Sequence, residues 1–230
     1  MDTIMKKNLI LLLSAALLVL ATGCEKTSQG LTRITYYPVI SLQGDNPYVV
    51  QLGGNYTEPG YSASLNGEDY TSGVIVDSNV NPAVPGIYSV TYSATNPDGC
   101  SWSTTRDVYV LNPGGIANVY IAHCWMGSRD YKGIPTVISP VSDGVYEIDD
   151  LCGGFYYAGR YPGYEPTYDF HADTQFTLNE DGTFNITKIG NWYFKGSFDY
   201  DNITGGYDFE TGEFDYDFDG LRVTLTPFTL

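Results

Sequence analysis

The stretch with the clearest chemical pattern is an acidic one near the C-terminus, Asp215–Gly220. Its Asp-x-Asp-x-Asp-Gly spacing matches the first half of a calcium-binding loop, whose twelfth position should be a bidentate Glu. Here that position is Thr226, so the loop is incomplete. The alternative is a β-strand with its aromatic residues on one face and its aspartates on the other. We favour the strand. A calcium site of another type remains an alternative and would use Asp199, Asp201 or Asp208.

No residue set in the chain has the spacing of a catalytic site. Ser128 lies near His123 but lacks a Gly-x-Ser-x-Gly elbow, and Cys124 next to His123 forms no dyad by adjacency alone. None of the many carboxylates stands in a recognisable hydrolase motif. With only two histidines, a zinc site has too few ligands. We predict no enzyme, no metal and no cofactor, and an extracellular hydrolase is the third-ranked alternative.

Aromatic side chains on loops are the remaining candidates for function. The stretch 123–131 has weak strand character, and tyrosines crowd between glycines and prolines from 156 to 168, which predicts loops in both places. Aromatic rings on loops can stack on sugars or hold peptide side chains. The alternative is that these rings pack the core, as we expect for Trp192. The candidate ligand-binding residues are Trp125, Tyr131, Tyr156, Tyr157, Tyr161 and Tyr164.

The composition predicts an all-β protein that positions these residues. The 230 residues include 21 tyrosines, 26 glycines and 12 prolines, and short segments between turn residues favour strands. No window after residue 30 has a sustained helical apolar period. A Pro/Gly linker at 112–115 separates a domain at 34–112 from an acidic, tyrosine-rich domain at 113–230. We expect the second domain to be a β-rich sandwich or barrel.

The first domain, residues 34–112, has about seven short segments with turns every ~8–12 residues, which is typical of an immunoglobulin-like sandwich. Gly53–Ser62, Pro85–Asn96 and Arg106–Val110 resemble a bacterial Ig-like family found in cell-surface proteins. That resemblance implies a spacer that holds the second domain away from a membrane.

The N-terminus has the order of a secretion signal. A basic start precedes the apolar run Leu9–Ala21, whose ~20 Å of helix is too short to span ~30 Å of hydrocarbon. Leu20–Cys24 resembles the lipobox of bacterial lipoproteins. The resemblance implies that residues 1–23 are removed, that Cys24 receives fatty acyl chains such as palmitate, and that residues 24–33 form a tether. The alternative is a secreted protein with an incidental cysteine.

Three further cysteines remain once Cys24 carries lipid: Cys100, Cys124 and Cys152. Disulfides can form outside the cytoplasm, and an odd number allows at most one bridge. We predict Cys124 with Cys152 because both lie in the second domain.

The charge balance excludes one class of partner. There are 27 acidic residues against 11 basic ones, a net charge of −16. Such a surface repels phosphate backbones and anionic lipid, so we expect no nucleic acid and attachment to the membrane through the lipid anchor only.

The second domain resembles the C-terminal domain of small two-domain surface lipoproteins that are typically encoded beside SusC/SusD-type outer-membrane nutrient importers. The resemblance implies an outer-membrane protein facing the cell exterior, with SusC/SusD-type subunits as partners. We expect it to capture oligosaccharide or peptide for a TonB-dependent importer. The alternative is a docking subunit without its own ligand. The matching segments are Asp149–Tyr156, Asp181–Phe184, Gly206–Asp208, Thr211–Glu213 and Val223–Leu225.

Overall fold

The computed structural model describes residues 34–164, 167–190, 192–194 and 202–229. The predicted signal peptide at 1–23, the lipidation site Cys24 and the tether at 24–33 lie outside the described residues. Nearly all regular structure in the described chain is β-strand, which confirms the all-β prediction. Neither short helix of the described chain is long and apolar enough to cross a membrane.

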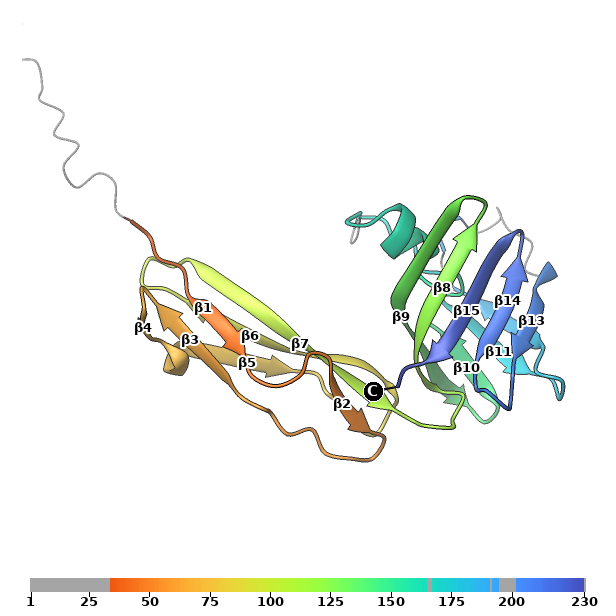
Figure 1. The fold of residues 1–230 in the computed structure, drawn as a ribbon, viewed down its shortest axis with the longest axis horizontal. Helices are drawn as coiled ribbons and strands as arrows, with labels where there is room; N and C mark the ends of the chain where they lie inside the picture. The colour runs from red at the N-terminus through yellow and green to blue at the C-terminus, as the bar shows by residue number, and fades with distance from the viewer. Residues whose placement is uncertain (1–33, 165–166, 191, 195–201, 230) are drawn as a thin grey trace, which may run out of the picture. The chain divides into compact units, whose positions relative to one another are not determined.

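The first seven strands form two sheets, as expected for an Ig-like domain (Figure 1). Pairing is antiparallel except between β2 and β7, which run parallel. A short 3₁₀ turn, η1 (Thr71–Gly73), leads into β5. One sheet has the order β1 (Val39–Leu42), β3 (Tyr61–Leu65), β4 (Glu68–Asp69). The other has the order β2 (Tyr48–Gln51), β7 (Ser101–Leu111), β6 (Gly86–Thr95), β5 (Val74–Ser78).

Alternation along β6 and β7 explains the core of this domain. Val90 and Tyr92 on β6 are buried together with Val108 and Val110 on β7, while the residues between them are mostly less buried. Side chains in a strand point to opposite faces in turn, so these residues share the inner face. Val50 of β2 completes the buried cluster.

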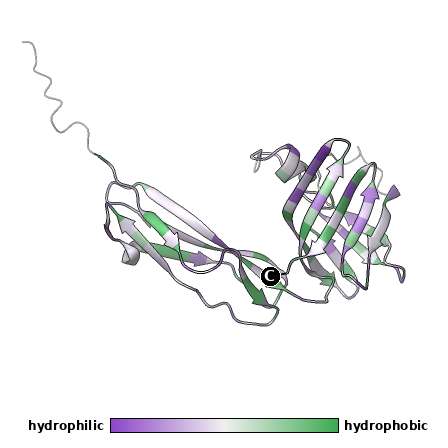
Figure 2. Ribbon diagram, in the orientation of Figure 1, coloured by the Kyte–Doolittle hydropathy of each residue, from purple (hydrophilic) through white to green (hydrophobic). Residues whose placement is uncertain are grey.

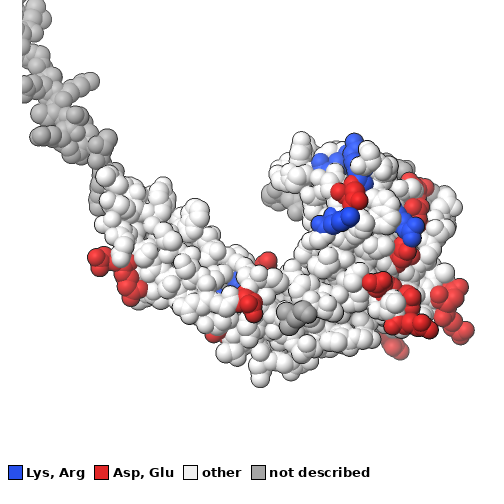
Figure 3. Space-filling view, in the orientation of Figure 1, with Lys and Arg blue, Asp and Glu red and all other residues white. Residues whose placement is uncertain are grey.

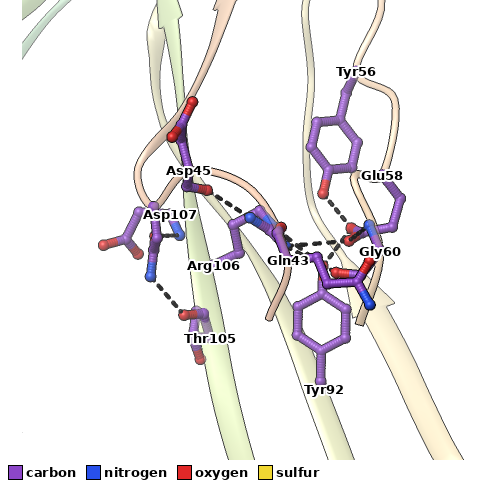
Figure 4. A network of polar contacts seen from close by, with 10 residues as sticks. Gln43, Asp45, Tyr56, Glu58, Gly60, Tyr92, Thr105, Arg106 and Asp107 are labelled. Atoms are coloured by element: carbon purple, nitrogen blue, oxygen red, sulfur yellow. Dashed lines mark hydrogen bonds and ion pairs between the residues drawn. The ribbon is translucent and has the colours of Figure 1, made fainter. Parts of the chain in front are cut away.

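One charged side chain, Arg106 on β7, is completely buried in this domain (Figure 4). Its guanidinium donates to the carbonyl oxygens of Gln43 at 2.7 Å and Gly60 at 3.2 Å. It also donates to the carbonyl oxygen of Asp45 and forms an ion pair of 3.4 Å with Glu58. Main-chain carbonyl oxygens therefore accept most of the hydrogen bonds of the Arg106 guanidinium, a cation that would be costly to bury unpaired.

Glu58 joins this network through two tyrosines. The hydroxyls of Tyr56 and Tyr92 both donate to its carboxylate. Burial by itself would raise the pKa of Glu58, but these two hydrogen bonds, a third from the Gly60 amide and the charge of Arg106 leave it below its usual value of 4.5. The ionised form of Glu58 is therefore the form that stabilises the fold.

We predict that Glu58→Gln lowers the free energy of unfolding by about 1–3 kcal/mol at neutral pH, because it weakens hydrogen bonds to a charged group. The folded pKa lies below 4.5, so the contribution of the carboxylate is complete above about pH 4.5 and is lost as pH falls through the folded pKa. Urea denaturation from pH 7 to pH 3 should show the difference from wild type shrinking with acidification. Glu68→Gln on exposed β4 is the control. A difference that does not change with pH would contradict this account.

The remaining eight strands form a single antiparallel sheet in the second domain. The isolated bridge between Thr183 and Gly206, and the hydrogen bond of 2.8 Å from the Tyr207 amide to the Gly182 carbonyl, join its two edge regions. The sheet therefore curls into a barrel-like form. Its order is β12 (Phe184–Ile189), β11 (Thr174–Leu178), β10 (Val145–Ile148), β9 (Arg129–Ser142), β8 (Asn118–Met126), β15 (Leu221–Pro227), β14 (Phe214–Phe218), β13 (Thr204–Tyr207).

Strand β14 settles the interpretation of the acidic stretch. Phe214, Tyr216 and Phe218 are buried, whereas Asp215 is exposed, so the predicted strand is confirmed. Apolar and polar residues also alternate along neighbouring strands (Figure 2). The apolar side chains form the core on the inner face of the curled sheet. Within the described residues, no group of three or more His, Cys, Asp or Glu side chains is placed to hold a metal ion.

Two regions differ from the sequence prediction. The stretch 123–131, predicted as a loop, belongs to the hairpin of β8 and β9 with its turn at 127–128. Strand β9 contains Pro135 and Pro140, which cannot donate to a sheet and are unusual in a central strand. The structure places Pro140 beside a shift of register in the pairing of β9 with β10, where a missing donor is tolerated.

Candidate functional site

A long connection between β10 and β11, residues 149–173, carries most of the candidate aromatic residues. Its second residue is Asp150, whose side chain is completely buried. The Asp150 carboxylate accepts hydrogen bonds from the amides of Cys152 at 3.0 Å and Gly154 at 2.6 Å. It also accepts one from the amide of Ala172 at 3.0 Å, at the far end of the connection. One carboxylate therefore ties both ends of the connection together.

Two further hydrogen bonds hold the ends of this connection together. The Leu151 amide donates to the Ala172 carbonyl at 3.0 Å, and the Tyr216 hydroxyl donates to the Leu151 carbonyl at 2.8 Å. We call residues 151–172 the aromatic loop. Burial raises the pKa of Asp150, and the three backbone amides oppose that rise. These amides are the groups that make the buried Asp150 carboxylate tolerable.

Glycine is required where the aromatic loop leaves Asp150. Gly154 has a φ of +83°, and a Cβ there would lie 2.4 Å from a methyl carbon of Ile134. The π-helical turn η2 (Phe155–Arg160) follows directly. Its first two rings, Phe155 and Tyr156, are buried, so the start of the loop is fixed in the core.

Several predicted ligand residues turn out to pack against the protein itself. Tyr156 is buried in the core cluster, and Tyr131, on β9, packs edge-on against Phe155 at 5.3 Å. Tyr157 stacks on His171 with ring centroids 4.0 Å apart, and its hydroxyl donates to the Pro135 carbonyl at 3.3 Å. These three residues shape the loop and present little free ring surface.

Trp125 lies on the outer face of the sheet. The His123 ring is 4.5 Å from its ring, and the Arg222 guanidinium lies 5.5 Å from its ring centroid. Asp215 holds Arg222 through two hydrogen bonds of 3.0 and 2.7 Å. His123 and Arg222 of the same chain therefore already cover part of the Trp125 ring. Figure 3 shows basic side chains among the acidic ones on this side of the second domain.

The predicted disulfide is not formed in the structure, because Cys124 and Cys152 are both free and buried. The Cys124 thiol donates instead to the Gly153 carbonyl at 3.3 Å. Burial raises the pKa of Cys124 to about 12, and it raises that of Cys152 as well. Neither is a reactive thiolate at neutral pH.

The rest of the aromatic loop forms an open groove of about 290 Å³. Its hub is Phe170, a buried ring that contacts the other five, two of them stacked on it: Tyr161 at 4.9 Å and Phe194 at 5.6 Å. Phe170 lies two residues before Ala172, so Asp150 fixes its position. We call this the aromatic groove, lined by Tyr161, Tyr164, Tyr168, Phe170, Tyr193 and Phe194.

Three tyrosines at the rim of the aromatic groove are exposed to solvent. The exposed fractions are 53% for Tyr164, 43% for Tyr168 and 58% for Tyr193. Of the predicted ligand residues, only Tyr161 and Tyr164 thus line the aromatic groove. The tyrosines between glycines and prolines indicated this loop, but nothing in the sequence indicated that Tyr193 and Phe194, from another segment, would join it.

A larger cavity of about 530 Å³ is a weaker candidate. The turns 113–115 and 209–213 form much of its lining. Tyr207 there is buried, and the Phe228 ring packs edge-on against Tyr109 at 5.0 Å. It offers one well-exposed ring, Phe209, where the aromatic groove offers three.

Comparison with known proteins shows what the two domains are similar to. Residues 40–110 match a family model described as bacterial surface protein, Ig-like domain. Residues 115–227 match a model of a BT2262-like C-terminal domain. The chain is similar to the lipoprotein BT2262 from Bacteroides thetaiotaomicron, with 29% identity and a TM-score of 0.60. The match covers 82% of this chain and 98% of that one. No curated protein matches the chain.

We predict that Asp150→Asn loosens the aromatic loop more than the rest of the domain. The Asn side chain still accepts hydrogen bonds through its oxygen, but its NH₂ group faces one of the three amides and leaves that donor unpaired. The free energy of unfolding should fall by about 1–3 kcal/mol in urea denaturation. The near-ultraviolet circular dichroism of the packed rings should weaken.

The matched control is Asp143→Asn, at an exposed position in the turn between β9 and β10, which should change neither signal. An Asp150→Asn protein with wild-type aromatic dichroism would show that Asp150 does not hold the aromatic groove.

Proposed function

We propose that this chain is a non-catalytic cell-surface lipoprotein, anchored in the outer membrane through acylated Cys24. Its second domain captures oligosaccharide or peptide for a SusC/SusD-type importer. The aromatic groove is the observation that carries the capture role. Three exposed tyrosines around a buried aromatic floor make a surface that can bind a ligand with little loss of side-chain entropy.

The location rests on separate support. The chain is similar to a Bacteroides lipoprotein along most of its length, and residues 40–110 match an Ig-like domain of bacterial surface proteins. The Ig-like domain would add distance between the membrane and the second domain. Its buried Arg106 forms hydrogen bonds and an ion pair with groups of the same domain. We therefore assign it the role of a spacer.

A docking subunit without its own ligand is the second candidate, and the outer face of β8, β9 and β15 favours it. Trp125 lies there beside Arg222, and the Asp130 carboxylate contacts both His123 at 3.0 Å and Lys132 at 3.7 Å. Trp and Arg are enriched among the residues that dominate protein–protein interfaces. This face would contact an importer subunit.

We expect the native lipoprotein, solubilised from outer membranes, to co-purify with SusC/SusD-type subunits at near-stoichiometric yield. Cys24→Ala should leave the membrane fraction and lose these subunits, because the acyl chains supply the attachment. Cys100→Ala is the control and should behave as wild type. A wild-type lipoprotein that purifies alone would contradict both the capture and the docking roles.

The capture role predicts a second result. The soluble chain lacking residues 1–24 should give heat on calorimetric titration with a mixture of oligosaccharides or with a mixture of short peptides. Replacing Tyr164, Tyr168 and Tyr193 together by Ala should weaken that binding by about tenfold or more, since stacking contacts contribute roughly 0.5–1.5 kcal/mol each. Unchanged binding in the triple variant would place any ligand outside the aromatic groove.

A further inference from the structure

The aromatic groove offers a ligand two kinds of contact. Among the residues that the structure describes, its lining consists of six aromatic rings and includes no charged side chain. Four of the rings belong to tyrosines, so phenolic hydroxyls accompany the apolar faces. A matching ligand therefore has apolar patches next to hydroxyl-type hydrogen-bonding groups.

The hydroxyls of the groove differ from those of three other tyrosines in the second domain. Tyr120, Tyr157 and Tyr216 each donate to a main-chain carbonyl, at 2.8, 3.3 and 2.8 Å. In the described part of the chain, no such bond is made by the hydroxyls of Tyr161, Tyr164, Tyr168 and Tyr193. These four are therefore available as donors and acceptors to a bound molecule.

The described backbone of the turn at the groove, residues 161–164 and 167–168, does not offer a strand edge. The amide of Tyr164 donates to the Tyr161 carbonyl at 3.4 Å, and the amides of Thr167 and Tyr168 donate to the Tyr164 carbonyl at 3.0 and 3.2 Å. These donors are used within the turn. An extended peptide, which typically binds by adding a strand, would find no row of free main-chain groups there.

Building on the proposed function, we infer that the aromatic groove binds a short neutral oligosaccharide. The C–H faces of a sugar pack on the rings, and its hydroxyls bond to the four phenolic groups. The volume of about 290 Å³ is at the low end of the ~300–1,000 Å³ typical of small-ligand pockets, which fits a chain end or a short unit. Residues 113–230 carry 18 acidic and 6 basic side chains, a net charge of −12, so acidic sugars are disfavoured.

Calorimetry on the soluble chain lacking residues 1–24 tests this inference with three probe sets. They are neutral oligosaccharides of glucose, galactose and mannose; oligogalacturonates, as the acidic counterpart; and a library of neutral tripeptides. We expect binding to one or more neutral oligosaccharides, and at least tenfold weaker binding to the oligogalacturonates.

Two triple variants at Tyr164, Tyr168 and Tyr193 locate the contacts. Replacement by Phe keeps the rings but removes three hydroxyls, and should weaken sugar binding by about tenfold. Replacement by Ala removes the rings as well and should weaken sugar binding further than replacement by Phe does. The exposed control Tyr37→Ala, in the first domain, should bind as wild type. The rim positions are exposed, so these variants are expected to fold, which far-ultraviolet dichroism checks.

Each other outcome overturns the inference in a recognisable way. Tripeptide binding that the Ala variant abolishes would leave the proposed capture role intact and replace the ligand class. If neither triple variant changed sugar binding, the sugar would bind outside the aromatic groove. No binding to any of the three probe sets would overturn the inference and the capture role together.

Discussion

The second domain depends on a buried carboxylate that has to be satisfied. Asp150 lies in the core, where an unpaired charge would be strongly destabilising. The chain meets this requirement with three main-chain amides, two at the start of the aromatic loop and one at its end. Because Ala172 lies 22 residues after Asp150 along the chain, satisfying the carboxylate also closes the loop. The position of Phe170, and through it that of the whole aromatic groove, follows from this one electrostatic requirement.

The first domain contains a buried charge of the opposite sign, and backbone groups satisfy it in the same way. Arg106 is a completely buried cation, and carbonyl oxygens from separate segments of the chain accept its hydrogen bonds. In both domains a buried charged side chain forms hydrogen bonds with backbone groups of irregular segments. These backbone groups have no partner in a β-sheet, so the side chain supplies one. Such residues specify how loops attach to a β scaffold.

Much of the β architecture could be predicted from the sequence because it rests on local alternation. Phe214, Tyr216 and Phe218 alternate with aspartates, and that pattern alone indicated the strand that the structure contains. The candidate site was only partly predictable. Tyr156 and Tyr131 are ordinary tyrosines in sequence. The burial of Tyr156 and the partial burial of Tyr131 follow from a π-helical turn and a proline-containing strand that no periodicity indicates. Tyr193 joins Tyr168 through tertiary contact alone, at 5.6 Å. Nor does sequence show that His123 and Arg222 lie against Trp125.

The central claim is that the aromatic groove, held in place by Asp150, is the surface through which this protein contacts its ligand. Hydrogen-exchange mass spectrometry of the full lipoprotein, with and without a bound oligosaccharide or peptide, tests it most directly. The account predicts added protection in peptides that span Tyr161–Phe170 and in those containing Tyr193 and Phe194, with little change in β6 or β7. Protection confined to the first domain, or to the face around Trp125, would contradict it.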